Sequence, residues 1–210
     1  MIAPPERSPE RDAALRALLE RVPVEGWTMS ALRHALTDIG ADPLDAELLF
    51  PGGVRDLVEA FIDLADREMP TVTEGKLPER VRAVIAARLA WLRPHREAVR
   101  RAMGILALPG HARLVAACTA RTVDAIWHAA GDRSADFAWY TKRFILAGIY
   151  GATLLAWLRD PGDDDAATLA FLDRRLAGHA RFHRMQRRVE GMLTFRPCRR
   201  NRHDQSGATA

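Results

Sequence analysis

The chain has 210 residues, enough for one domain or a compact pair of subdomains with a substantial core. Its net charge is +4, but residues 174–202 carry ten arginines against one acid, Glu190, so the remainder is acidic. The two cysteines are isolated, and no apolar run approaches the roughly 20 residues that span a bilayer. We therefore expect no disulfide framework, and a soluble or peripheral protein of the bacterial cytoplasm.

Helical spacing of apolar residues and sparse β-branched residues predict an all-α fold. Four helices are expected in an N-terminal subdomain, residues 1–70. They start at Pro9 after the cap Ser8, near Thr28, at Pro43 and at Val54. A long helix, a short turn and a short second helix are typical of the helix-turn-helix of TetR-like repressors.

The short helix from Pro43 to about Leu49 lacks the residues that read DNA. It carries Asp42, Asp45 and Glu47 and no basic side chain, whereas contacts to phosphates and base edges require Arg, Lys, Asn or Gln. We predict that this part does not bind nucleic acid.

A second subdomain is expected over residues 77–178, with helices at about 78–93, 95–106 and 112–130 and a central helix at about 135–158. Gly131 would end the helix before the central one, and Ser134 would cap the central helix. Acids at 163–165 would precede the last helix, where the helix dipole favours them.

The central helix has aromatic residues on two faces and small residues between them. Glycines within a helix cost about 1 kcal/mol each relative to alanine, so close helix packing or space for a ligand should offset this cost. Both explanations remain open on the residues alone. If a ligand cavity forms, the expected lining is Val81, Ile85, Leu89, Leu92, Phe144, Gly148 and Leu155.

Residues 179–195 predict a basic amphipathic helix, a type that lies flat on anionic membranes. Its expected membrane-binding residues are Arg181, Phe182, Arg184, Met185, Arg188, Val189, Met192 and Leu193. Packing of the same apolar stripe on the protein body is the alternative. Residues 196–210 are expected to form a disordered tail.

No catalytic or metal-binding motif is apparent. The seven histidines form no paired Glu-x-x-His repeats, as a di-iron bundle would require, and nucleotide-binding and hydrolase motifs are absent. We therefore expect no enzymatic activity, no catalytic residues, no metal and no cofactor other than a bound lipid or isoprenoid.

The region around the central helix closely resembles the bacterial branch of the coenzyme Q biosynthesis accessory proteins, the Coq-nine family. Weaker similarity extends from about Trp27 to Leu172. The matching residues are Val123, Asp124, Ile126, Trp127, Ala130, Gly131, Asp132, Ser134, Asp136, Trp139, Tyr140, Thr141, Lys142, Arg143, Leu146, Ala147, Gly148, Ile149 and Tyr150. Ala125, His128 and Ala138 depart from the residues that the family tends to carry.

The resemblance implies a TetR-like helical fold without DNA binding, a cavity for an isoprenoid or phospholipid, and support for the di-iron demethoxyubiquinone hydroxylase late in ubiquinone synthesis. It also implies that a patch of Asp136, Trp139, Tyr140 and Arg143 docks the hydroxylase. We expect a homodimer, peripheral on the inner membrane. The alternative is a TetR-like transcription regulator with an apolar effector.

Overall fold

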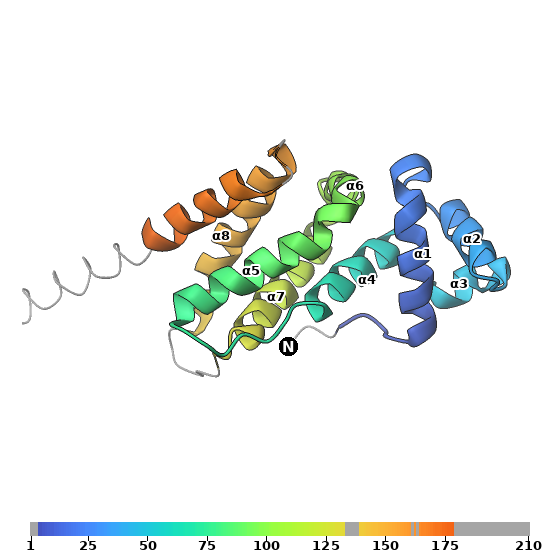
Figure 1. The fold of residues 1–210 in the computed structure, drawn as a ribbon. Helices are drawn as coiled ribbons and strands as arrows, with labels where there is room; N and C mark the ends of the chain where they lie inside the picture. Colours follow the sequence, from blue (N-terminus) through green and yellow to red (C-terminus); the bar gives the residue numbers. More distant parts are fainter. Residues whose placement is uncertain (1–3, 133–138, 161, 163, 179–210) are drawn as a thin grey trace, which may run out of the picture. The chain divides into compact units, whose positions relative to one another are not determined.

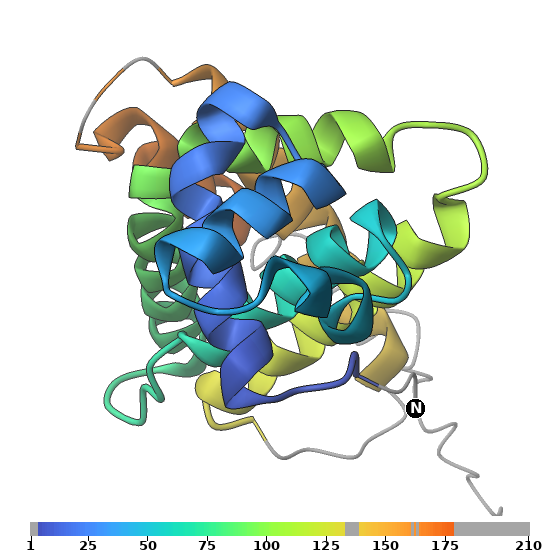
Figure 2. The same ribbon diagram turned by 90° about the vertical axis from the view of Figure 1, so that its right-hand side faces the viewer.

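The computed structural model describes residues 4–132, 139–160, 162 and 164–178 (Figures 1 and 2). All regular secondary structure in these ranges is helical, which confirms the all-α class. The chain divides into two compact units, Met1–Asp173 and Arg174–Ala210. The expected division between residues 70 and 77 falls inside the first unit and stays a prediction. Of the second unit, residues 174–178 are described, and they are helical.

The helices agree with the predicted boundaries to within a few residues, except that the short third helix splits into a 3-10 turn and a single α-turn. The elements are α1 Pro9–Glu25, α2 Met29–Asp38, η1 Pro43–Asp45, α3 Ala46–Leu49, α4 Val54–Arg67, α5 Leu77–Leu92, η2 Arg93–His95, α6 Arg96–Leu106, α7 Ala112–Ala129 and α8 Trp139–Arg159. A further helix begins at residue 166.

Side-chain caps start the first two helices. The Ser8 hydroxyl accepts from the backbone N–H of Arg11, and the Thr28 hydroxyl accepts from that of Ala31. The apolar side chains of Leu15, Leu18, Leu19 and Val22 on α1 are buried. Helix α1 packs against α2, which lies beside it in Figure 2. These contacts bury the hydrophobic face of the helix-turn-helix-like part.

Helix α4 lies between the N-terminal helices and the group of α5, α7 and α8 (Figure 1), and it packs against both α1 and α7. The indole N–H of Trp27 donates to the carbonyl of Ala98 over 2.9 Å, and its ring lies 5.1 Å from that of Phe61. The N-terminal helices are thus joined to α4 and α6 through one shared core rather than a loose linker.

The turn after α8 is held by Asp165. Its carboxylate accepts from the indole N–H of Trp157 at 2.9 Å and pairs with Arg93 and Arg96 at 2.6 and 2.9 Å. The acidic run does precede the last helix as expected. However, Asp165 is buried and directed at these three side chains, so it anchors the end of α8 to η2 and α6.

The predicted amphipathic helix at 179–195 and the tail at 196–210 lie outside the described residues. Within the ranges that the structure does describe, no helix is both long and apolar enough to cross a membrane.

Candidate functional site

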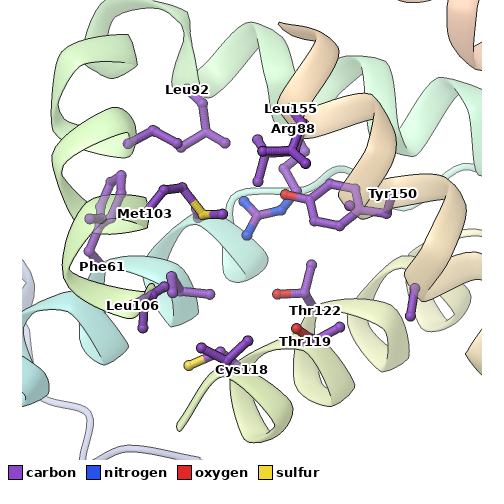
Figure 3. Close-up of a pocket in the computed structure, with 18 of the residues that line it drawn as sticks. Phe61, Arg88, Leu92, Met103, Leu106, Cys118, Thr119, Thr122, Tyr150 and Leu155 are labelled. Carbon is purple, nitrogen blue, oxygen red and sulfur yellow. The ribbon is translucent and has the colours of Figure 1, made fainter. Parts of the chain in front are cut away.

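A pocket of about 360 Å³ lies among α4, α5, α6, α7 and α8 (Figure 3). All five helices belong to the first unit. The lining residues are Phe61, Ile62, Ala65, Arg88, Leu92, Val99, Ala102, Met103, Leu106, Ala107, Val115, Cys118, Thr119, Thr122, Ala147, Tyr150, Gly151, Leu154 and Leu155. Residues of α5, α7 and α8 therefore meet at one cavity, together with residues of α4 and α6.

The size and lining of the pocket suit a small apolar ligand or a segment of a longer one. Ligand sites span about 300–1,000 Å³ and are mostly apolar with a few placed polar groups. An apolar cavity of about 150 Å³ is already enough for benzene. Leu155 is substantially exposed although it lines the pocket, which puts an open rim at α8.

One wall of the pocket is polar. Arg88 of α5 is 3% exposed, and its Nη2 lies 2.7 Å from Oδ1 of Asp66, the penultimate residue of α4. The Thr122 hydroxyl of α7 donates to Oδ2 of the same carboxylate at 2.9 Å. The Arg88 guanidinium carbon lies 5.6 Å from the Tyr150 ring centroid (Figure 3). Four helices thus contribute to a buried polar cluster at the edge of an apolar space.

The environment of this cluster shifts its acid–base equilibria. Burial raises the pKa of Asp66 to about 6, although the charge of Arg88 and the hydrogen bond from Thr122 act in the opposite direction. Burial likewise raises the pKa of the Cys118 thiol to about 11. Cys118 therefore behaves as a small apolar wall residue, not as a nucleophile.

Of the seven residues expected to line the cavity, two line it, three are buried beside it, and two lie outside it and are exposed. Leu92 and Leu155 line it. Val81, Ile85 and Leu89 are buried along the same face of α5 but do not belong to the lining.

Phe144 and Gly148, the other two, do not line the pocket either. Phe144 is 83% exposed and Gly148 is also exposed, because α8 turns Leu146 and Tyr150 into the core instead. The α8 lining is therefore Ala147, Tyr150, Gly151, Leu154 and Leu155.

Arg88 and Asp66 were not singled out from the sequence. One pattern could have identified Arg88: it lies three residues after Ile85 and four before Leu92, on the apolar stripe of α5. A charged residue on the buried face of a helix requires a buried partner or a ligand.

The predicted partner-binding patch is described in part. Asp136 lies outside the described residues, and Trp139 and Tyr140 begin α8, where the structure gives their backbone. Arg143 is partly exposed and pairs with Asp124 of α7. The expected membrane-binding residues from Arg181 to Leu193 lie outside the described ranges.

The part of the chain that the structure describes contains no cluster of three or more His, Cys, Asp or Glu side chains that could hold a metal ion.

Residues 112–183, which cover α7, α8 and the following helix, match the COQ9 family model. The chain is 34% identical to the mitochondrial ubiquinone biosynthesis protein COQ9 of Rattus norvegicus, over 77% of this chain and 56% of that protein. It is 33% identical to the Homo sapiens protein of the same name, over 77% of this chain and 55% of that protein. The chain thus spans little more than half the length of these curated relatives.

Among solved structures, the fold is similar to that of a TetR transcriptional regulator from Nitrosomonas europaea ATCC 19718. The TM-score is 0.66 at 23% identity, over 82% of this chain and 99% of that one. This similarity confirms the predicted TetR-like architecture. The family match and the identities to the two COQ9 proteins show that the chain is related to the COQ9 ubiquinone biosynthesis proteins, and the structural similarity shows that it has a TetR-like helical fold.

Proposed function

We propose that this protein takes part in ubiquinone biosynthesis as a lipid-binding accessory protein without catalytic activity of its own. In this proposal it holds isoprenoid quinone intermediates and presents them to a di-iron hydroxylase at the membrane. The observation that carries the proposal is the apolar pocket of about 360 Å³ lined by five helices. The similar proteins from Rattus norvegicus and Homo sapiens are named ubiquinone biosynthesis proteins, which supports the proposed pathway.

The pocket suits an isoprenoid chain better than a polar metabolite. Phe61, Leu92, Met103 and Leu106 supply large apolar surfaces, and the polar groups are confined to one wall (Figure 3). A chain longer than the pocket would leave it over the rim at Leu155. Apolar burial of about 25 cal/mol per Å² would then stabilise the enclosed segment.

The proposed contact with the hydroxylase involves the patch at the start of α8, with Trp139, Tyr140 and Arg143. Aromatic and arginine side chains dominate protein–protein hot spots, which fits this composition. Arg143 pairs with Asp124 across α7 and α8, so the two helices present charged groups side by side at this point.

The proposed membrane contact involves residues 179–195, whose basic and apolar residues alternate at helical spacing. Deletion of residues 179–210 should abolish flotation with vesicles that contain phosphatidylserine. Unchanged flotation would show that another surface makes the contact. A homodimer and a peripheral location on the bacterial inner membrane belong to the same proposal.

The most direct test is mass spectrometry of lipids extracted from the natively purified protein. We expect a near-stoichiometric isoprenoid quinone or a related long-chain lipid, released on denaturation. Protein that carries no lipid and binds none from ubiquinone-containing vesicles would contradict the proposal.

A TetR-like regulator with an apolar effector is the competing function, because the fold is shared with a transcriptional regulator. The acidic short helix argues against it: Asp42 and Glu47 are exposed there, and Glu47 pairs with Arg33 of α2. We therefore expect no specific complex in a DNA-binding assay at low salt. A sequence-specific, lipid-sensitive complex would favour the regulator.

A further inference from the structure

Arg88 places unused hydrogen-bond donors in the wall of an apolar pocket. The Arg88 side chain is only 3% exposed to solvent. It lines the cavity together with Leu92 of the same helix. A buried guanidinium is costly unless its charge is balanced and its N–H groups are bonded. The two requirements are met to different degrees here.

The charge of Arg88 is balanced. Its Nη2 lies 2.7 Å from Oδ1 of Asp66, whose side chain is 7% exposed, and Asp66 is held in turn by the Thr122 hydroxyl. The donors are less well satisfied. Nε and Nη1 of Arg88 have no hydrogen-bond partner among the residues that the structure describes. Figure 3 shows the Arg88 guanidinium next to the Tyr150 hydroxyl, within the pocket.

We infer that this pocket binds a neutral amphiphile through a carbonyl-type oxygen, which accepts a hydrogen bond from one of the two unpartnered nitrogens of Arg88, Nε or Nη1. The inference rests on the proposed function, since it specifies the ligand class of the same pocket. The rest of the ligand is apolar, because the remaining lining is mostly aliphatic and aromatic. A quinone ring carries oxygens of this kind.

Charge decides between a neutral and an anionic head group. Asp66 already neutralises Arg88 at 2.7 Å, so a ligand carboxylate would bring a second negative charge beside the Asp66 carboxylate in a site of low dielectric. A neutral carbonyl oxygen accepts a hydrogen bond from Arg88 without that repulsion. The arrangement therefore selects ketones, quinones and esters over fatty acids.

Three probes of similar size separate these contributions: pentylbenzene, its ketone analogue valerophenone and the anion para-pentylbenzoate. Their dissociation constants can be measured at pH 8 by displacement of the neutral fluorophore N-phenyl-1-naphthylamine from the 210-residue protein. Because the ketone and the hydrocarbon differ in hydration, the informative quantity is the ratio of their affinities, compared between variants. Hydration of the free ligands cancels in that comparison.

The Arg88 variant is built so that no unpaired charge remains. Arg88→Met is combined with Asp66→Asn and compared with Asp66→Asn alone. Arg82→Met on the same helix is the matched control, because Arg82 pairs with Asp173 at the surface and does not line the pocket. Replacement of Arg88 should lower the preference for valerophenone over pentylbenzene by at least about tenfold, as expected for loss of one hydrogen bond to a charged donor. The Arg82 control should leave it unchanged.

The charge argument is tested by Asp66→Asn against the unmodified protein. The affinity for para-pentylbenzoate relative to valerophenone should rise by at least about tenfold, because the repelling carboxylate is gone. An unchanged ratio, or tighter binding of the benzoate than of the ketone by the unmodified protein, would overturn the neutral ligand class. An unchanged ketone preference in the Arg88 variant would overturn the role of Arg88 while pentylbenzene still binds. Failure of all three probes to bind would overturn the proposed function itself.

Discussion

The Nη2 atom of Arg88 lies 2.7 Å from Oδ1 of Asp66, and this ion pair joins α5 to α4 at the wall of the apolar pocket. Isolated buried ions are unfavourable, and a buried pair recovers this cost only in part. The Asp66–Arg88 pair is therefore a poor device for stability alone. Its position beside a cavity fits the proposed role of Arg88 in ligand binding.

Asp66 should give the free energy of unfolding a distinctive pH dependence. Its pKa is about 6 in the folded protein against an ordinary 3.8, mainly because it is buried. The folded state then binds more protons than the unfolded state between these two values. The contribution of Asp66 to stability should therefore be greatest below about pH 4 and fall by about 3 kcal/mol as the pH rises past 6.

Comparison with Asp66→Asn isolates this contribution, because all other titrating groups are common to both proteins. Urea unfolding can be measured at about pH 4.5, 5.5, 6.5 and 7.5, which spans this window. The variant should gain stability relative to the unmodified protein as the pH rises. A constant difference across the series would show that the pKa of Asp66 is not raised.

The Cys118 thiol should react slowly with maleimides. Burial raises its pKa to about 11, from an ordinary 9.0, and the side chain lies in the pocket wall. At pH 8 its thiolate fraction should be about 100-fold lower than that of an unperturbed thiol. The rate can be measured in a Cys198→Ser background, with the same protein in urea as the reference. Equal rates in the two states would mean that the pocket is open to solvent at Cys118.

Much of the fold could be predicted because local patterns determine it. Ser8 acts as the expected cap, and the second helix begins next to Thr28 as expected. Gly131 adopts a φ of +71° just after α7, as expected for a glycine that ends a helix. The inner stripe of α5 is buried at every predicted position. Such features depend on neighbours within a turn or two, which the sequence contains directly.

The pocket could be predicted less well, because it depends on how helices rotate against one another. The spacing on α8 separates two faces, but it does not say which one turns inward. Packing turns Tyr150 and Leu146 toward the core, leaves Phe144 exposed, and makes Gly151 rather than Gly148 a lining residue. The Arg88–Asp66 ion pair could not be predicted either, because the two residues are 22 positions apart in the sequence and lie on different helices.

The patch at the start of α8 should separate partner binding from stability. Arg143→Ala removes a partly exposed ion pair with Asp124, and such pairs contribute about 0–1 kcal/mol to stability. We expect Arg143→Ala and Tyr140→Ala to leave the melting temperature nearly unchanged. Each should weaken hydroxylase binding by at least about 1 kcal/mol, if the patch is a hot spot.

Melting curves and pull-down with the hydroxylase can be read in parallel. Arg82→Ala is the control, since it removes a comparable surface pair, with Asp173, on a different helix. Normal partner binding together with a large loss of stability would assign Tyr140 and Arg143 to the core instead.

Two glycines of α8 provide the sharpest test of the pocket. Outside its own stretch of helix, a Cβ atom at either Gly148 or Gly151 would meet no atom within 4 Å. The rest of a larger side chain would extend into the pocket at Gly151 and into solvent at Gly148. Replacement of either should stabilise the helix by up to about 1 kcal/mol. Gly151 lines the pocket, whereas Gly148 is exposed outside it.

The decisive measurement is therefore the amount of lipid that copurifies with Gly151→Leu and with Gly148→Leu, quantified by mass spectrometry against the unmodified protein. A pocket that holds an apolar chain predicts a large loss of bound lipid in Gly151→Leu, since the new side chain fills the space, and full occupancy in Gly148→Leu. Both variants should fold at least as stably as the unmodified protein. Full lipid occupancy in a folded Gly151→Leu variant would contradict the assignment of the ligand to this pocket.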